Sequence, residues 1–159
     1  MTLTLRGQSK IMIVSEAWSE EEAKEGRPFV GSTGFILKGM LSTAGVKLED
    51  CYVTQVIARR NHDVKLLCGG KPEALPNYPA IIKGKYIRNE FAPDLNRLYK
   101  EIRDANPNVI IALGPLASWA LLKSSGIKSV RGSMAPTHPE VTEILGRQYN
   151  CLLYTSDAA

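Results

Sequence analysis

The sequence predicts an α/β protein: a single three-layer α/β/α domain built on a central parallel sheet of four strands. Short apolar runs rich in β-branched residues, which are typical of buried parallel strands, recur along the chain. Stretches with the apolar spacing of helices separate them. Strands that alternate with helices through right-handed crossovers give a doubly wound sheet. The expected strands cover residues 11–14, 51–57, 109–113 and 149–154.

The first strand opens the stretch with the strongest functional signal, residues 11–45. Glu16 follows the strand directly, at the end where open α/β sheets bind ligands, and a carboxylate is costly there without a partner or a function. Phe29 stands between Pro28 and two glycines, where packing alone does not require an aromatic. Both residues also have a structural interpretation. Glu16 could be a solvated loop acid, and Phe29 could fill the end of the core.

Helices are expected on both sides of the later strands. A polar, acid-rich loop precedes Gly26, and an amphipathic helix after Gly34 ends at Gly45 as its C-cap. Residues 92–104 predict a helix with an apolar stripe at helical spacing, and Pro115 suits the first turn of another. The stripe consists of Phe91, Leu95, Leu98 and Ile102.

Length and composition indicate an ordinary globular protein. The 159 residues suit one domain over residues 1–159, with 44% hydrophobic and 23% charged residues. The net charge of +4 and the isoelectric point of about 9.0 are compatible with a nucleic-acid partner. No apolar run is long enough to cross a bilayer, and the first residues lack the apolar stretch of a signal peptide. A cytoplasmic protein is therefore expected.

Several common enzyme motifs are absent from the sequence. Ser15 does not lie in the G-x-S-x-G context of a hydrolase nucleophile. Residues 31–39 contain no G-x-x-x-x-G-K-[ST], and no G-x-G-x-x-G marks a dinucleotide site. The cysteines show no C-x-x-C spacing, so reduced thiols are expected at Cys51, Cys68 and Cys151.

One ordered string resembles a known family. Glu16-Ala17, the sequence Gly-Arg-Pro-Phe-Val-Gly at 26–31, Gly34 and the helix after it are similar to the uracil-DNA glycosylase superfamily. The similarity is greatest to the branch of the iron–sulfur glycosylases and their phage-encoded relatives. The family pattern has Gly-Glu-(Ala/Gly)-Pro-Gly after the strand. Here Ser15 replaces the first Gly and Trp18-Ser19 replaces Pro-Gly.

The resemblance implies a DNA glycosylase that hydrolyses the N-glycosidic bond of uracil, or of a related deaminated base, in base excision repair. Such enzymes act on a nucleotide flipped out of the stack. The resemblance gives Phe29 the role of stacking on the base, and Gln55 replaces the Asn that reads its edge. Glu16 would position water or stabilise the sugar cation, and the Ala17 amide would bind a uracil carbonyl.

The implied partner is uracil-containing DNA. The protein is expected to act as a monomer and not to bind a membrane. Arg59, Arg60 and Arg131 are the candidate phosphate contacts. The irregular stretch 64–87 is either a phosphate-binding surface or a solvated insertion. The iron–sulfur members carry four ligating cysteines, two of them before the first strand, whereas this chain has none before Cys51. No metal cluster and no other cofactor are therefore expected.

In the resembled family a late His-Pro segment donates a hydrogen bond to the departing uracil oxygen. The dipeptide is present as His138-Pro139, but it precedes the candidate strand 149–154, whereas the family motif follows its last strand. Either His138 acts from an unusual loop, or the motif is lost with a truncated C-terminus. The second is favoured, and 155–159 then reads as a non-native tail.

A second class of function remains open on the sequence: a non-catalytic, phage-type DNA-binding or replication accessory protein with a glycosylase-like fold. Gln55 and the altered loop after Glu16 are the features that favour it. A glycosylase releases free base from uracil-containing DNA, whereas a binding module only shifts the mobility of that DNA.

Overall fold

A six-stranded sheet forms the centre of the protein, with the strand order β1-β3-β2-β6-β8-β7. The computed structural model describes residues 5–6, 10–17, 20–27, 32–58, 64–124 and 133–154. The strands of this sheet are β1 (Leu5–Arg6), β2 (Ile11–Ser15), β3 (Tyr52–Gln55), β6 (Val109–Leu113), β7 (Met134–Pro136) and β8 (Asn150–Tyr154).

The four inner strands, β3, β2, β6 and β8, run parallel to one another. This confirms the predicted parallel sheet of four strands. The two outer strands, β1 and β7, are antiparallel to their neighbours and were not predicted. They are two and three residues long, which is too short to show an alternating apolar pattern.

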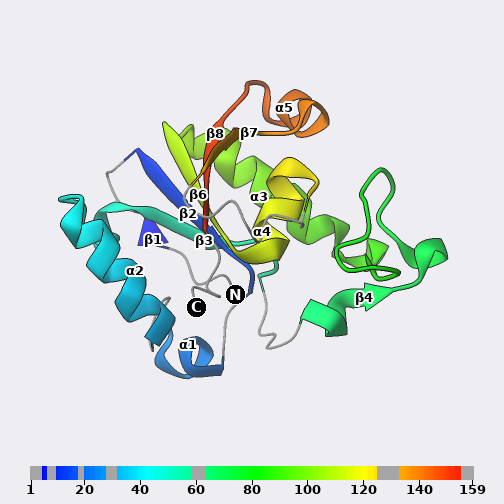
Figure 1. Ribbon diagram of the computed structural model, residues 1–159, viewed down its shortest axis with the longest axis horizontal. Coiled ribbons are helices and arrows are strands. Elements are labelled where there is room, and N and C mark those ends of the chain that lie inside the picture. The colour runs from blue at the N-terminus through cyan, green and yellow to red at the C-terminus, as the bar shows by residue number, and fades with distance from the viewer. Residues whose placement is uncertain are drawn as a thin grey trace.

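Helices cover both faces of the sheet, so the predicted three-layer α/β/α arrangement is confirmed (Figure 1). Helix α2 lies on one face, and α3, α4 and α5 lie on the other. The helices are α1 (Glu20–Glu25), α2 (Ser32–Thr43), α3 (Ala92–Ala105), α4 (Gly114–Leu122) and α5 (Pro139–Leu145). Four 3-10 turns accompany them: η1 (Leu48–Asp50), η2 (Val64–Leu67), η3 (Lys71–Glu73) and η4 (Asn89–Phe91).

Strand β2 shows why its sequence is continuously apolar. Side chains alternate across a strand. Ile13 packs with Leu37 and Leu41 of α2, whereas Met12 and Val14 belong to the larger cluster on the opposite face. All three β2 side chains are fully buried, because helices cover both faces of the central strand.

Helix α3 packs on the larger cluster through the predicted stripe. Its members are all buried: Phe91, Leu95, Leu98 and Ile102. Pro93 lies in the first turn, where no helical donor is needed, and Asn106 ends the helix in the left-handed conformation with φ +46°. Gly45 likewise follows α2 with φ +77° and fits its predicted role as a C-cap.

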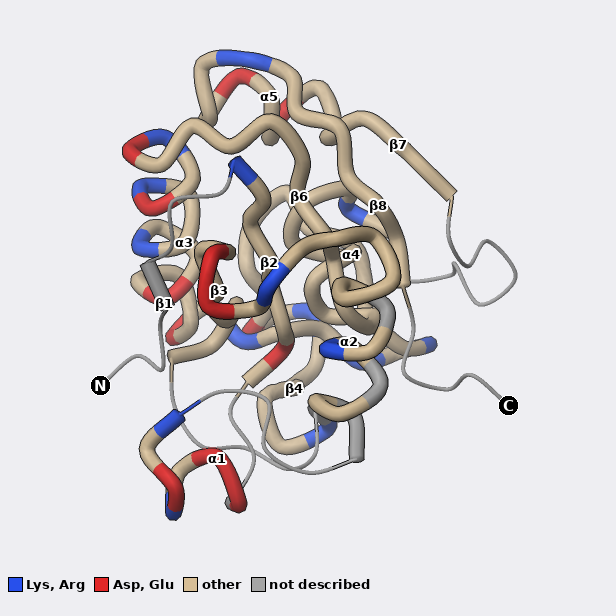
Figure 2. The backbone as a smooth tube through the Cα atoms, turned by 90° about the vertical axis from the view of Figure 1, so that its left-hand side faces the viewer, with Lys and Arg blue, Asp and Glu red and all other residues tan. Residues whose placement is uncertain are grey.

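Two segments differ from the expected loops. The acid-rich stretch before Gly26 contains the helix α1, which Figure 2 shows with acidic residues along most of its length. The irregular stretch after residue 63 contains a two-stranded antiparallel sheet of β4 (Cys68–Gly69) and β5 (Tyr86–Ile87). The helix α1 and the strands β4 and β5 are so short that their apolar spacing in the sequence does not distinguish them from turns.

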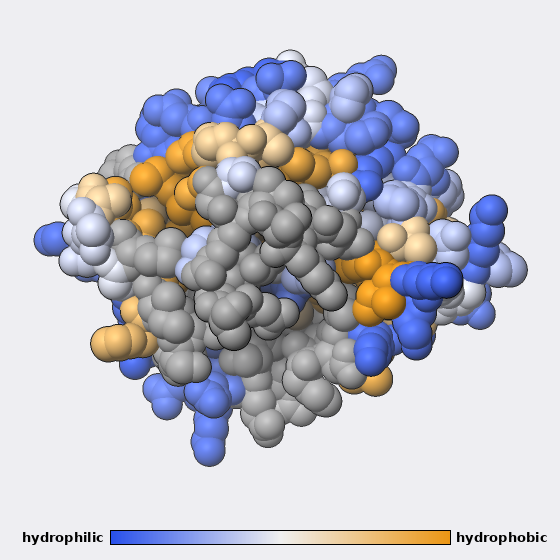
Figure 3. All heavy atoms as spheres, in the orientation of Figure 1, coloured by the Kyte–Doolittle hydropathy of each residue, from blue (hydrophilic) through white to orange (hydrophobic). Residues whose placement is uncertain are grey.

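The face drawn in Figure 3 shows hydrophilic side chains around apolar areas. The exposed large hydrophobic side chains of the described residues are Phe35, Leu66, Ile82, Met134 and Ile144. None of the helices described here is both long and apolar enough to cross a membrane.

Candidate active site

The parallel strands end along one side of the sheet, the carboxyl edge, whose last strand residues are Gln55, Ser15, Leu113 and Tyr154. In this register Ser15 lies beside Gln55. The Val56 amide donates to the Ser15 carbonyl at 2.9 Å. The Ile57 amide donates to the Glu16 carbonyl at 3.0 Å. Glu16 and Gln55 therefore leave neighbouring parallel strands side by side, as the sequence predicted.

The Glu16 carboxylate binds the start of helix α4. Its Oε2 accepts a hydrogen bond from the backbone amide of Leu116 at 2.8 Å. The first turn of a helix has amides without helical partners, and the helix dipole is positive there, so both favour a carboxylate. The half-buried Glu16 side chain is thereby anchored between β2 and α4.

Gly114, the first residue of α4, makes room for that carboxylate. Its φ is +89°, and a Cβ at this position would lie 2.8 Å from Glu16 Cδ and 3.0 Å from Glu16 Oε2. Distances this short are not tolerated between packed atoms, so a side chain at residue 114 would displace Glu16. The positive φ and the close approach of Glu16 are thus two separate reasons for glycine at this position.

Gln55 is almost completely buried, with 1% of its surface exposed. Burial of a side-chain amide among apolar residues is unfavourable unless its polar atoms are hydrogen-bonded. An amide both donates and accepts, which suits it to the edge of a pyrimidine. The burial and the position beside Glu16 make Gln55 the base-reading candidate of the described residues.

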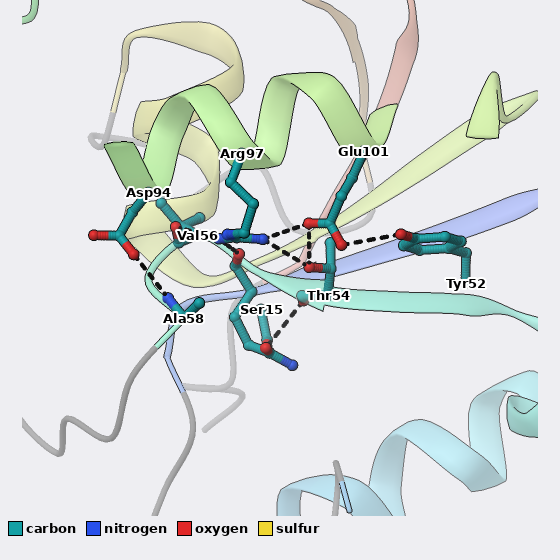
Figure 4. A network of polar contacts seen from close by, with 9 residues as sticks. Ser15, Tyr52, Thr54, Val56, Ala58, Asp94, Arg97 and Glu101 are labelled. Carbon is teal, nitrogen blue, oxygen red and sulfur yellow. Dashed lines mark hydrogen bonds and ion pairs between the residues drawn. The ribbon is translucent and has the colours of Figure 1, made fainter. Parts of the chain in front are cut away.

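A polar network joins α3 to the end of β3 (Figure 4). Arg97 Nη2 donates to the carbonyl oxygens of Gln55 at 2.6 Å and Val56 at 2.8 Å. Its Nη1 donates to Thr54 Oγ1 at 3.1 Å and forms an ion pair with Glu101. The guanidinium therefore contacts three consecutive residues at the carboxyl end of one strand.

Glu101 and Asp94 extend this network along α3 (Figure 4). Glu101 accepts hydrogen bonds from the hydroxyl groups of Tyr52 and Thr54, each at 2.9 Å. Asp94 Oδ1 accepts from the Ala58 amide at 3.3 Å. The residues of the network carry no distinctive signal in the sequence, since ion pairs at i and i+4 are common on helices.

The other predicted site residues fall into two groups. Ala17, which follows Glu16, is half-buried and packs against the larger core cluster. Four predicted residues lie outside the part of the chain that the structure describes: Phe29, Arg59, Arg60 and Arg131.

His138 lies near the amino ends of the parallel strands, whereas Glu16 and Gln55 lie at their carboxyl ends. It follows β7, which runs antiparallel to β8 and pairs Pro136 with Asn150, the first residue of β8. The His138 imidazole caps α5: its Nδ1 accepts from the Glu140 amide at 3.1 Å. In Figure 1, α5 lies far from the carboxyl ends of the parallel strands. The structure therefore does not bring His138 together with the other candidates.

The segment 64–88 carries four exposed lysines and the half-buried Arg88. Arg88 pairs with Glu90 at 2.7 Å and donates to the Leu66 carbonyl at 3.2 Å, so it holds the segment together. In Figure 1 the segment and α1 lie on opposite sides of the carboxyl end of β2. The exposed basic residues of the segment are Lys65, Lys71, Lys83 and Lys85.

The cysteines do not fit an iron–sulfur cluster. Cys51 packs with the residues under α2, whereas Cys151 is buried on the opposite face of the sheet. Cys68 is half-buried and packs against the larger core cluster, which also contains Cys151. The sequence has three cysteines in all. Among the described residues, no group of three His, Cys, Asp or Glu side chains is placed to bind a metal ion.

Three ionisable groups with shifted pKa values lie on elements that pack around α3 and α5. Burial raises the pKa of the Tyr99 phenol far above its usual value, and its hydroxyl donates to the Ala120 carbonyl at 2.7 Å. Burial likewise raises the pKa of the Cys151 thiol to about 12. The pKa of Glu140 is lowered by its hydrogen bond with Lys123. The shifts of Tyr99 and Cys151 reflect burial on the α3 side of the sheet, whereas that of Glu140 reflects its pairing with Lys123.

The profile of the Uracil DNA glycosylase superfamily matches residues 4–154, and the chain belongs to this superfamily. The resemblance seen in the sequence is thereby confirmed.

Three relatives are named Type-4 uracil-DNA glycosylase. That of Thermotoga maritima is 30% identical over 127 residues, which are 79% of this chain and 56% of the relative. That of Pyrobaculum aerophilum is 33% identical over 116 residues, 73% of this chain and 50% of the relative. That of Archaeoglobus fulgidus is 29% identical over 133 residues, 80% and 57% of the two chains. The chain thus spans about half the length of the curated relatives it matches.

Proposed function

We propose that this chain is a DNA glycosylase that hydrolyses the N-glycosidic bond of uracil, or of a related deaminated base, in DNA during base excision repair. The observation that carries the proposal is the meeting of Glu16 and Gln55 at the carboxyl edge of a sheet of this superfamily. The names of the three relatives support the same substrate.

The reaction develops two opposite charges. The deoxyribose passes through an oxocarbenium-like state while the base leaves as an anion, as in other glycoside hydrolyses that proceed through such a cation. Glu16 stabilises the sugar cation or positions the attacking water. Its carboxylate is already fixed by the Leu116 amide, so little reorganisation is required when charge develops.

Recognition of the base is assigned to Gln55, Ala17 and Phe29. The Gln55 amide reads the edge of the flipped base, and the Ala17 amide binds a uracil carbonyl. Phe29 stacks on the ring, an interaction typically worth about 1–3 kcal/mol per base. Gln55 is one methylene longer than the Asn of the resembled family, which makes a base-preference assay part of any test.

The group that donates a hydrogen bond to the departing base is not among the residues assigned so far. His138 caps α5 at the far side of the sheet, and this favours a structural role for it. Strand β8 ends at Tyr154 beside Leu113, on the same edge as Glu16. We therefore propose that the donor belongs to the natural reading frame after β8, in keeping with the truncated C-terminus expected from the sequence.

DNA approaches from the side of segment 64–88 in this proposal. Its four exposed lysines attract phosphates, whereas the acidic helix α1 on the other side of β2 repels them (Figure 2). Arg59, Arg60 and Arg131 are proposed as further phosphate contacts. The protein is proposed to act as a cytoplasmic monomer.

The test is release of free base from single-stranded and duplex DNA that contains uracil, hypoxanthine or xanthine. Glu16→Gln should lower the single-turnover rate by about 100-fold or more, since acid–base and charge-stabilising groups typically contribute that much. Glu21→Gln, on the exposed acidic helix, is the matched control and should leave the rate unchanged.

The same assay decides the origin of the donor. His138→Ala should change the rate little, and extension by the natural reading frame should raise it by about 100- to 1000-fold. Loss of base release in His138→Ala, at unchanged DNA affinity, would show that His138 is the donor. If no form of the protein releases base while the DNA mobility still shifts, the non-catalytic binding module is the correct function.

A further inference from the structure

We propose that Arg97 of α3 is a positioning residue for base recognition. Together with Glu101 it holds the backbone of Gln55 and Val56, so that the Gln55 amide is presented to the flipped base. The inference rests on the proposed function of the same site. It assigns a role in base recognition to helix α3, which contacts the carboxyl end of β3 through Arg97 and Asp94.

The outer side of β3 needs such a support. Strand β1 pairs with Tyr52 and Val53, and its described residues do not reach Gln55. The two carbonyl groups after this pairing accept hydrogen bonds from Arg97 Nη2, at 2.6 Å for Gln55 and 2.8 Å for Val56. Arg97 thus continues the hydrogen bonding of the strand beyond the end of β1.

The inner side of the same backbone is bonded to the Glu16 loop. The amides of Val56 and Ile57 donate to the carbonyl groups of Ser15 and Glu16 at 2.9 and 3.0 Å. Residues 55–57 are therefore held between α3 and β2. A shift on the α3 side changes the position of Gln55 relative to Glu16.

The guanidinium is itself fixed in orientation. Glu101 pairs with it, Thr54 accepts from it, and the two charged side chains of the pair are only 25% and 16% exposed. A planar guanidinium presents five donors in a rigid fork, whereas a lysine ammonium has no such fork. Lys100 and Asp104 have the same spacing on α3 but are 70% and 65% exposed, so they provide a matched control pair.

The Gln55 side chain depends on this backbone because it is 99% buried and cannot reorient freely. Misplacement of a recognition group by about 1 Å can lower a reaction rate by roughly 100-fold. A defect at Arg97 should therefore appear in recognition of the base rather than in affinity for the DNA backbone.

The experiment measures the affinity ratio between two DNA probes. One carries 2′-fluoro-deoxyuridine, whose electron-withdrawing fluorine disfavours the oxocarbenium-like state, and the other carries a tetrahydrofuran abasic analogue. Arg97→Lys and Arg97→Met should lower this ratio roughly tenfold, the effect of about one hydrogen bond, while binding of the abasic probe is unchanged. Lys100→Met should leave both affinities unchanged.

Tyr99→Phe separates positioning from stability. It removes the buried hydroxyl group that donates to the Ala120 carbonyl but leaves both carbonyl contacts of Arg97. We expect a lower melting temperature with the wild-type ratio retained. If Arg97→Met does not fold, Arg97→Lys decides the outcome.

An unchanged ratio in Arg97→Lys, or equal loss of both affinities, would overturn the inference. A ratio that falls in Tyr99→Phe as far as in Arg97→Lys would also overturn it, because recognition would then follow stability alone. A wild-type ratio near one is a different failure, since it contradicts the proposed function and the inference together.

Discussion

Gly114→Ala tests the packing of Glu16 against the start of α4. The added Cβ would lie 2.8 Å from Glu16 Cδ, and residue 114 has a φ of +89°. A left-handed conformation costs about 1–2 kcal/mol for a residue with a side chain. Displacement of Glu16 also breaks its hydrogen bond with Leu116, and such a bond to a charged group contributes about 1.5–3 kcal/mol.

The expected loss in free energy of unfolding is therefore about 2.5–5 kcal/mol, measured by urea denaturation. Gly146→Ala is the matched control, since Gly146 has a φ of +81° and no atom within 4 Å of its added Cβ. Gly146→Ala should lower the free energy of unfolding only by the cost of the left-handed conformation, about 1–2 kcal/mol.

A double-mutant cycle isolates the contact. In a Glu16→Ala background the carboxylate is gone, so Gly114→Ala should cost no more than Gly146→Ala. Base release should fall in Gly114→Ala and not in Gly146→Ala. Equal stability losses for the two glycine variants in the wild-type background would refute the proposed anchoring of Glu16.

Three further predictions concern the α3 side of the sheet. Tyr99→Phe should lower the free energy of unfolding by about 1–3 kcal/mol in urea, because it leaves the buried Ala120 carbonyl without the phenol that donates to it. A thiol reagent at pH 8 should label Cys68 before Cys151, because burial raises the pKa of Cys151 from 9.0 to about 12; mass spectrometry of timed samples reports the order. The same shift should lower stability as the pH rises from about 9 towards 12, since only the unfolded thiol ionises there.

The parts predicted from the sequence are those in which a few neighbouring residues determine the structure. The apolar run at Ile11 gives a strand buried on both faces, and the stripe through Leu98 gives the packed face of α3. The meeting of Glu16 with Gln55 follows because consecutive parallel strands end at one edge.

The parts that were missed depend on contacts between distant residues. Arg97 and Glu101 look like any surface ion pair at this spacing, and only the docking of α3 on β3 distinguishes them from Lys100 and Asp104. His138 did carry a local signal, since a proline directly after it is typical of a helix N-terminus. Its family-like dipeptide concealed that simpler interpretation.

The most direct test is a crystal structure of the protein with DNA that carries 2′-fluoro-deoxyuridine. We expect the uracil to be flipped out and bound at the carboxyl edge, with its ring edge on the Gln55 amide and the sugar next to the Glu16 carboxylate. A uracil that remains stacked in the DNA, or that binds at the α5 side near His138, would contradict the proposed site.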